Sequence, residues 1–212
     1  MKISTSSFFD GCRYNNILSV KMYIENNYDI NKTNIDRNNG FMLACMHEHL
    51  EIIKLIVNEQ KFNGFNIINN NGYNAMMSTC KNDNVAIFNY IMKYCILNPS
   101  ELFPVCCRYG SNNIAKILLD IDKKSCLNAR NLFRNYGLEI CCQFNNYECA
   151  KLIIENLNEN DNVSFDLWDI FTSLFNHGNL KLLKLIIGKK HLAFCNHKIC
   201  DIVDFHLYLV QT

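Results

Sequence analysis

A short apolar motif recurs along the chain at nearly constant spacing. Its two clearest copies begin at His49 and Asn179 and read His-Leu-Glu-Ile-Ile-Lys-Leu-Ile and Asn-Leu-Lys-Leu-Leu-Lys-Leu-Ile. Weaker copies begin at Asn16, Asn84, Asn113 and Asn146. The second residue of each copy lies at position 17, 50, 85, 114, 147 or 180, so the steps are 33, 35, 29, 33 and 33 residues. A period of this length predicts a chain built from stacked supersecondary repeats.

Each copy of the motif has the periodicity of one helical face. In the second copy, Leu50, Ile53 and Val57 follow the spacing of an amphipathic helix. A second apolar segment precedes most copies, at 41–46, 75–80, 104–109, 138–144 and 170–175. A tight polar turn separates the two segments, so each unit is predicted to be helix, turn, helix and polar loop. One helix pair cannot bury its apolar face alone, and neighbouring pairs must therefore supply the other wall.

This pattern resembles the ankyrin repeat family, in which two helices recur about every 33 residues. Asn71–Met76 stands where the family has a loop glycine followed by Thr-Pro-Leu, and Pro104 falls at the family's proline position. Asp29–Asn31 matches the Asp-Val-Asn that follows the second helix, and His177–Asn179 matches the Gly-His turn. The chain departs from the family in three respects: Thr-Pro-Leu-His is intact nowhere, the loop through Phe62–Asn71 is stretched, and the fourth unit is shortened.

The resemblance implies an all-α fold, an ankyrin-type α-solenoid of about six helix–turn–helix repeats with a closing C-terminal helix. We expect a single repeat domain over residues 1–212. Its repeats are predicted at about 4–36, 37–70, 71–99, 100–131, 132–163 and 164–190, followed by a C-terminal cap at 191–212. Asparagine accounts for 33 of the 212 residues, and such Asn-rich, divergent repeats are similar to those of large DNA viruses.

Composition narrows the functions to consider. The formal net charge is +1, so the chain lacks the excess of basic residues that phosphate binding requires, and we expect no nucleic-acid partner. No apolar stretch approaches the roughly 20 residues that span a bilayer, and we expect no membrane association. The 12 cysteines follow no signal peptide, and several lie within apolar helical patterns. We therefore predict unbonded thiols and a cytoplasmic protein, in the host cytoplasm if the source is a virus.

No catalytic motif is present, and we predict that the protein is not an enzyme and needs no cofactor. One constellation has the residue types of a metal site: His191, Cys195, His197 and Cys200 offer four zinc ligands within ten residues. Its spacing fits no common zinc finger. Two interpretations stay open for this segment, a zinc site and a polar loop whose cysteines pack into the cap.

The resemblance also implies one candidate modification. Asn31 corresponds to a loop asparagine that an asparaginyl hydroxylase can modify in other ankyrin proteins. The alternative is that this side chain hydrogen-bonds its own turn, as asparagine commonly does.

The resemblance implies a binding face formed by the first helices and the loop tips. The residues at the family's variable positions are Arg13, Tyr14, Met46, His47, Tyr73, Lys81, Asn82, Gln143, Phe144, Trp168, Asn176 and His177. Aromatic and arginine side chains on such a face are typical of binding hot spots. For Trp168 and Phe144, packing inside a divergent repeat is the alternative.

The predicted function is that of a monomeric adaptor or scaffold that binds an unidentified protein partner, a host protein if the source is a virus. Two alternatives remain. One is a metal-binding protein that uses the His191–Cys200 cluster, and the other is a structural repeat protein without a specific partner.

Overall fold

The computed structural model describes residues 4–158, 161, 163 and 165–188. Within these ranges the chain forms twelve helices and two isolated β-bridges, and no β-strand. The predicted all-α repeat fold is confirmed, whereas the predicted cap at 191–212 lies outside the described residues. The chain divides into two compact units, residues 1–98 and 99–212.

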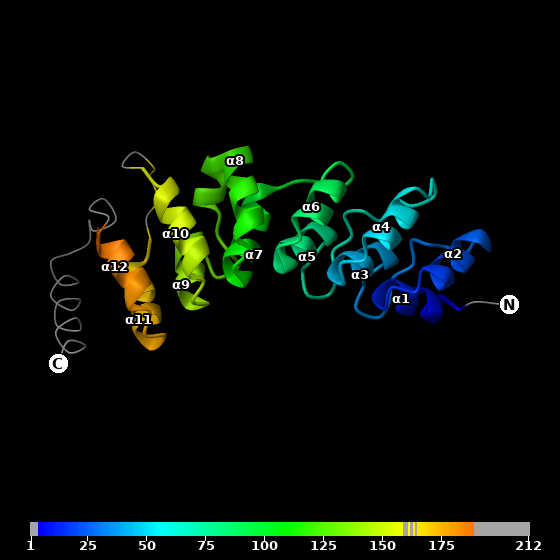
Figure 1. Cartoon of the computed structure of the whole chain (residues 1–212), viewed down its shortest axis with the longest axis horizontal. Helices are drawn as coiled ribbons and strands as arrows, with labels where there is room; N and C mark the ends of the chain where they lie inside the picture. The colour runs from blue at the N-terminus through cyan, green and yellow to red at the C-terminus, as the bar shows by residue number, and fades with distance from the viewer. Residues whose placement is uncertain (1–3, 159–160, 162, 164, 189–212) are drawn as a thin grey trace. The chain divides into compact units, whose positions relative to one another are not determined.

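Unit 1 contains three helix pairs (Figure 1). They are α1 (Thr5–Arg13) with α2 (Ile17–Glu25), α3 (Gly40–Met46) with α4 (Leu50–Val57), and α5 (Ala75–Asn82) with α6 (Val85–Ile91). The first helices pack in the order α1, α3, α5, and α2 packs on α4. Apolar side chains such as Phe8, Phe41 and Ile53 are buried between the pairs. Each pair therefore completes the core of its neighbour.

Unit 2 repeats this arrangement. Its pairs are α7 (Pro99–Tyr109) with α8 (Asn112–Asn128), α9 (Gly137–Gln143) with α10 (Tyr147–Asn156), and α11 (Leu167–Asn176) with α12 (Leu180–Gly188). The first helices α7, α9 and α11 pack in order, and the second helices α8, α10 and α12 do the same. Helix α8 is kinked at Asp122, which leaves the helical region of backbone space with φ −151° and ψ 83°.

A residue in the left-handed conformation closes the turn inside every pair. These residues are Asn15, Glu48, Asp83, Gly110, Asn145 and Gly178, with φ between 53° and 72°. Glycine adopts this region without a steric penalty, and asparagine and aspartate tolerate it better than other residues. The turn chemistry of the sequence therefore ends each first helix abruptly and returns the chain antiparallel.

Among the described helices, none combines the length and the apolar character that a membrane span requires.

Candidate functional site

Three long loops, which we call fingers, share one construction. Finger 1 (residues 33–39) precedes α3, finger 2 (68–74) precedes α5 and finger 3 (130–136) precedes α9. An isolated antiparallel bridge closes the base of finger 1 between Thr33 and Asn39, and another closes finger 3 between Arg130 and Tyr136. Fingers 1 and 3 are thus short hairpins with a defined shape, although the sequence there is polar and irregular.

One asparagine organises each finger from within. The Oδ1 atoms of Asn34, Asn69 and Asn131 each accept backbone N–H bonds from the residues two and four positions ahead, at 2.9–3.0 Å. Such bonds are the Asx-turn chemistry by which asparagine replaces a backbone acceptor in a tight turn. They satisfy backbone groups of the finger within the loop, so each finger keeps its shape without packing on a core.

The residue three positions after this asparagine adopts the left-handed conformation. In finger 2 it is Gly72, with φ 78°, but in fingers 1 and 3 it is arginine, with φ 62° at Arg37 and 65° at Arg134. A side chain with a Cβ is held there at a cost of about 1 kcal/mol or more. Strain of this kind concentrates at functional sites, and both arginine side chains are exposed.

Large apolar side chains stand at the tips of these arginine-bearing fingers. Ile35 in finger 1 is 93% exposed, and in finger 3 Leu132 and Phe133 are 99% and 82% exposed. A monomeric protein gains no stability from apolar groups in this position. Ile35 stands alone, whereas Leu132 and Phe133 are adjacent, and adjacent exposed apolar residues on a shaped loop are typical of interaction sites.

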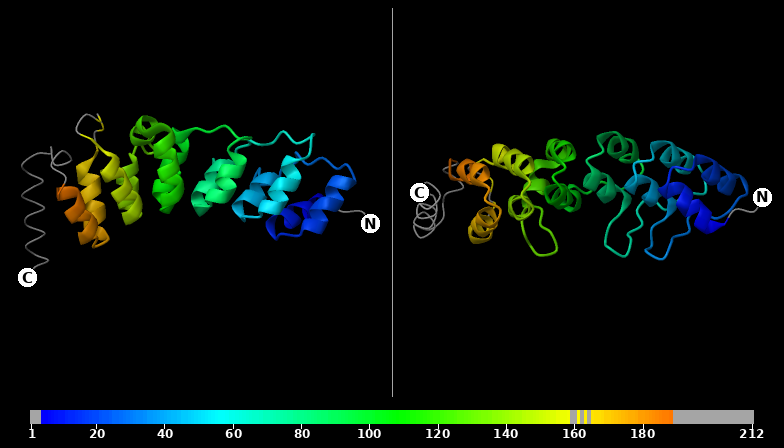
Figure 2. Two further views of the ribbon diagram at one scale, coloured as in Figure 1. Left: turned by 45° about the horizontal axis from the view of Figure 1, so that its top comes forward. Right: turned by 60° about the horizontal axis from the view of Figure 1, so that its bottom comes forward.

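Fingers 1 and 2 are joined to each other in unit 1. The side chain of Asn70 donates to the carbonyl oxygen of Ile35 at 3.0 Å, and its backbone N–H donates to that of Asp36 at 2.9 Å. Nearer the base, Asn69 Nδ2 donates to Asn38 Oδ1 at 2.9 Å, where both side chains are buried. In the right-hand view of Figure 2 the two fingers, in blue and teal, extend side by side from unit 1. Unit 1 thus presents a double finger that is already assembled.

Finger 3 is held at its base by aromatic and charged groups. The guanidinium of Arg130 lies 4.1 Å from the centre of the Tyr136 ring and donates to its hydroxyl group. The carboxylate of Glu139 accepts the backbone N–H of Tyr136 at 2.6 Å and that of Asp166. Burial raises the pKa of Glu139, while these two backbone bonds oppose the shift. Residues 129–138 contain two arginines and no acidic residue, so the finger itself is positively charged.

The turns inside the helix pairs form a second continuous edge in each unit. In unit 1 the His49 Nε2 lies 2.9 Å from the carbonyl oxygen of Arg13, and Asn82 Nδ2 donates to the carbonyl oxygen of Met46 at 2.9 Å. In unit 2 the His177 Nε2 lies 2.9 Å from the carbonyl oxygen of Gln143. These bonds lock each turn onto the turn of the preceding repeat.

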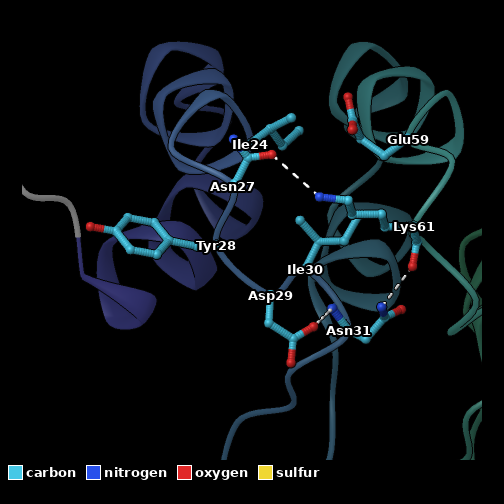
Figure 3. Close-up of a pocket in the computed structure, with 8 residues that line it drawn as sticks. All are labelled: Ile24, Asn27, Tyr28, Asp29, Ile30, Asn31, Glu59 and Lys61. Carbon is cyan, nitrogen blue, oxygen red and sulfur yellow. Dashed lines mark hydrogen bonds between the residues drawn. The ribbon is translucent and has the colours of Figure 1, made fainter.

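A pocket of about 260 Å³ lies in unit 1 between the loops that follow α2 and α4 (Figure 3). Its lining residues are Ile24, Asn27, Tyr28, Asp29, Ile30, Asn31, Glu59 and Lys61. Asn31 Nδ2 donates to the carbonyl oxygen of Lys61 at 2.8 Å, and Asn31 Oδ1 accepts the N–H of Asn63 at 3.0 Å. One wall of the pocket is therefore a hydrogen-bonded joint between two consecutive loops.

Comparison with known proteins agrees with this architecture. Residues 8–101 match the family model of ankyrin repeats, in three copies. Residues 8–101 therefore contain ankyrin repeats. The ankyrin repeat domain of human ASB11, known from its crystal structure, superposes with a TM-score of 0.60 at 15% sequence identity, covering 81% of this chain and 83% of that one. At this identity the likeness concerns the fold alone. No curated protein matches the sequence.

Most residues that we predicted at the binding face of these ankyrin repeats lie on the turn edge. In unit 1 they are Arg13, Tyr14, Met46, His47, Lys81 and Asn82, and in unit 2 they are Gln143, Phe144, Asn176 and His177. Burial lowers the pKa of the His47 imidazole, and the neighbouring His49 and Arg13 lower it further. The structure brings these residues together within each unit.

Tyr73 and Trp168 lie at the other end of the first helices. Tyr73 is at the base of finger 2, and its N–H is one of those bound by Asn69. It precedes α5, whereas Asn82 ends that helix, so the two are separated by roughly 12 Å of helical rise. Trp168 is in the first turn of α11 and is 63% exposed. The predicted face therefore combines two regions of the repeat.

For Trp168 and Phe144 the sequence left two interpretations open, binding and packing, and both side chains are accessible to solvent. Phe144 is 45% exposed, and the guanidinium of Arg108 lies 5.0 Å from the centre of its ring.

The Asn31 side chain bonds the next loop rather than its own turn. Asn66 makes the corresponding joint one repeat later, since its Oδ1 accepts the N–H of Ile96 at 2.8 Å. These joints give Asn31 a structural role, and its hydroxylation stays a prediction. The candidate zinc ligands His191, Cys195, His197 and Cys200 lie outside the described residues.

Sequence reasoning missed the finger tips. Their signal is an apolar residue placed directly after a loop asparagine, as in Asn34-Ile35 and Asn131-Leu132-Phe133, away from the helical apolar pattern.

Proposed function

We propose that this protein is a non-catalytic adaptor that binds a protein partner through its finger tips, with the turn edge as a second contact region. Ankyrin repeats are protein–protein interaction modules that are typically not catalytic, which supports the general function. The proposed compartment is the cytoplasm. The observation that carries the choice of site is the tip of finger 3, where Leu132 and Phe133 are almost fully exposed side by side.

The energetics of burial favour this tip as an anchor. Covering a large apolar side chain stabilises a complex by about 1.5–3 kcal/mol, so Leu132 and Phe133 together contribute about 3–6 kcal/mol. The Asn131 bonds hold the loop in shape before binding, so little conformational entropy is lost when a partner docks. Arg134 follows the pair directly, and arginine is one of the residue types enriched in binding hot spots.

The test is affinity capture from a lysate of the cells in which the protein occurs. We expect that replacing both tip residues with serine, Leu132→Ser and Phe133→Ser, removes a partner that the native chain captures. Ile121→Ser is the control, because Ile121 is an exposed apolar residue of unit 2 that lies on α8 and not in a finger. Circular dichroism verifies that each variant is folded.

The outcomes separate the proposal from its alternatives. A partner lost with the tip variant and retained with the control supports the finger-tip site. A partner captured equally by all three proteins moves the site away from finger 3. Capture of nothing by the native chain favours the structural repeat protein without a partner.

A further inference from the structure

Three cysteine side chains converge in the core of unit 2. Cys107 of α7, Cys141 of α9 and Cys149 of α10 have Sγ atoms that all lie within 4.8 Å of one another. All three side chains are fully buried. The sulfurs come from three helices and two successive repeats, so a group bound by all three would join the repeats covalently. We propose that this cluster is a binding site for a trivalent thiophilic metalloid, represented by arsenic(III).

The spacing suits an ion held by three sulfurs. At a bond length of roughly 2.3 Å and the angles of about 100° of a pyramidal arsenic(III) centre, three sulfurs lie about 3.5 Å apart. The sulfurs therefore need to approach one another by at most about 1.3 Å from their present limit of 4.8 Å. A change of the cysteine side-chain torsion moves a sulfur by such a distance.

The surroundings decide which ion the cluster favours. All three cysteines are fully buried, so solvent does not stabilise a net charge on the bound group. Three thiolates leave a net charge of −2 around copper(I) and −1 around zinc(II), and a buried charge without a partner is costly. Around a trivalent centre the charge is zero. A closed structural zinc site also takes four protein ligands, whereas this group of described residues offers three.

The binding reaction balances without an oxidant or a base. Arsenous acid and three thiols exchange three As–O bonds for three As–S bonds. Each thiol proton leaves with one hydroxyl group, so three waters are released and the oxidation state of arsenic is unchanged. Because the sulfurs are fully buried, arsenic enters only when the packing of α7, α9 and α10 opens transiently, and we expect slow uptake.

The sequence supplies unusually close controls. Cys106 and Cys142 are the immediate neighbours of Cys107 and Cys141, and they are equally buried but not part of the cluster. We would titrate the full, reduced chain with arsenite and compare Cys141→Ala with Cys142→Ala. Inductively coupled plasma mass spectrometry measures the bound arsenic. The rise in melting temperature measures how much the bound arsenic stabilises the fold.

We expect the Cys142→Ala variant to bind one more arsenic per chain than the Cys141→Ala variant. Loss of a ligand lowers affinity by more than about 100-fold, because even changes behind the ligands cost about 10–100-fold. If Cys142→Ala loses as much bound arsenic as Cys141→Ala does, the proposal is overturned. If Cys141→Ala does not fold, the pair Cys107→Ala and Cys106→Ala replaces it. X-ray absorption of the native complex is an independent test: three sulfur neighbours support the site, and oxygen neighbours overturn it.

Discussion

Asn39 is predicted to be the most important single asparagine of unit 1. Its Oδ1 accepts the N–H of Met42 at 2.8 Å and so caps α3, while its Nδ2 donates to the carbonyl oxygen of Gly64 at 2.8 Å. The side chain is fully buried. Asn39→Ala removes both bonds and leaves the buried Gly64 carbonyl without this donor. It also removes the link between finger 1 and the loop that leads to finger 2.

The magnitude follows from these two bonds. Loss of a helix cap costs about 1 kcal/mol. An unpaired buried polar group costs about 1–3 kcal/mol more. We therefore expect Asn39→Ala to lower the free energy of unfolding by about 2–4 kcal/mol, out of a total that is typically about 5–15 kcal/mol.

Asn74 is the matched control in the same unit. It caps α5 in the same way, with its Oδ1 2.8 Å from the Met77 nitrogen, and it lies closer to solvent. Asn74→Ala should cost about 1 kcal/mol, the value of the cap alone. Urea unfolding followed by far-UV circular dichroism measures both variants. Losses for Asn39→Ala and Asn74→Ala that agree within about 0.5 kcal/mol, the worth of a weak hydrogen bond, would refute the role assigned to the Gly64 bond.

Three further predictions concern stability, and urea or thermal unfolding measures each. Residues 37 and 72 both adopt the left-handed conformation, which favours glycine. Arg37→Gly should therefore leave stability unchanged or raise it by up to about 1 kcal/mol, whereas Gly72→Ala should lower it by about 1 kcal/mol. The opposite order of the two stabilities contradicts this reasoning. Gly40→Ala should destabilise by about 1–3 kcal/mol, since its Cβ would lie 2.5 Å from the Phe8 ring, and unchanged stability would mean that the ring moves aside freely. Burial raises the pKa of Cys142 from 9.0 to about 12. The buried thiol therefore contributes its full stabilisation below pH 9, and the free energy of unfolding that it contributes falls by about 1.4 kcal/mol per pH unit as pH rises toward 12. A stability that does not change above pH 9 contradicts the assignment.

The repeat pattern located the second helices closely, whereas α7 begins at Pro99, five residues before the predicted segment at 104–109. The second residues of five motif copies, at positions 17, 50, 85, 147 and 180, are the first residues of α2, α4, α6, α10 and α12. Apolar periodicity and turn chemistry are local properties, so one sequence carries them. Among the second helices only α8 differs, since it begins at Asn112, two residues before position 114.

The candidate site was harder to predict because it depends on contacts between repeats. The partners of Asn31 are Lys61 and Asn63, about one repeat away, and no local pattern shows such a bond. Exposure of Ile35 and Leu132 likewise depends on how the fingers leave the helices, whereas an apolar residue in a loop suggests burial when only the sequence is considered.

The central claim is that a partner covers the tip of finger 3. The most direct measurement places a photoreactive phenylalanine analogue at the position of Phe133, irradiates the protein in the lysate, and compares it with the same analogue at Ile121. We expect one crosslinked partner at the finger position, and we expect an excess of native protein to reduce this crosslinking, whereas an excess of the Leu132→Ser, Phe133→Ser variant does not. Equal crosslinking at the two positions, or competition by the native protein and the variant alike, would contradict it.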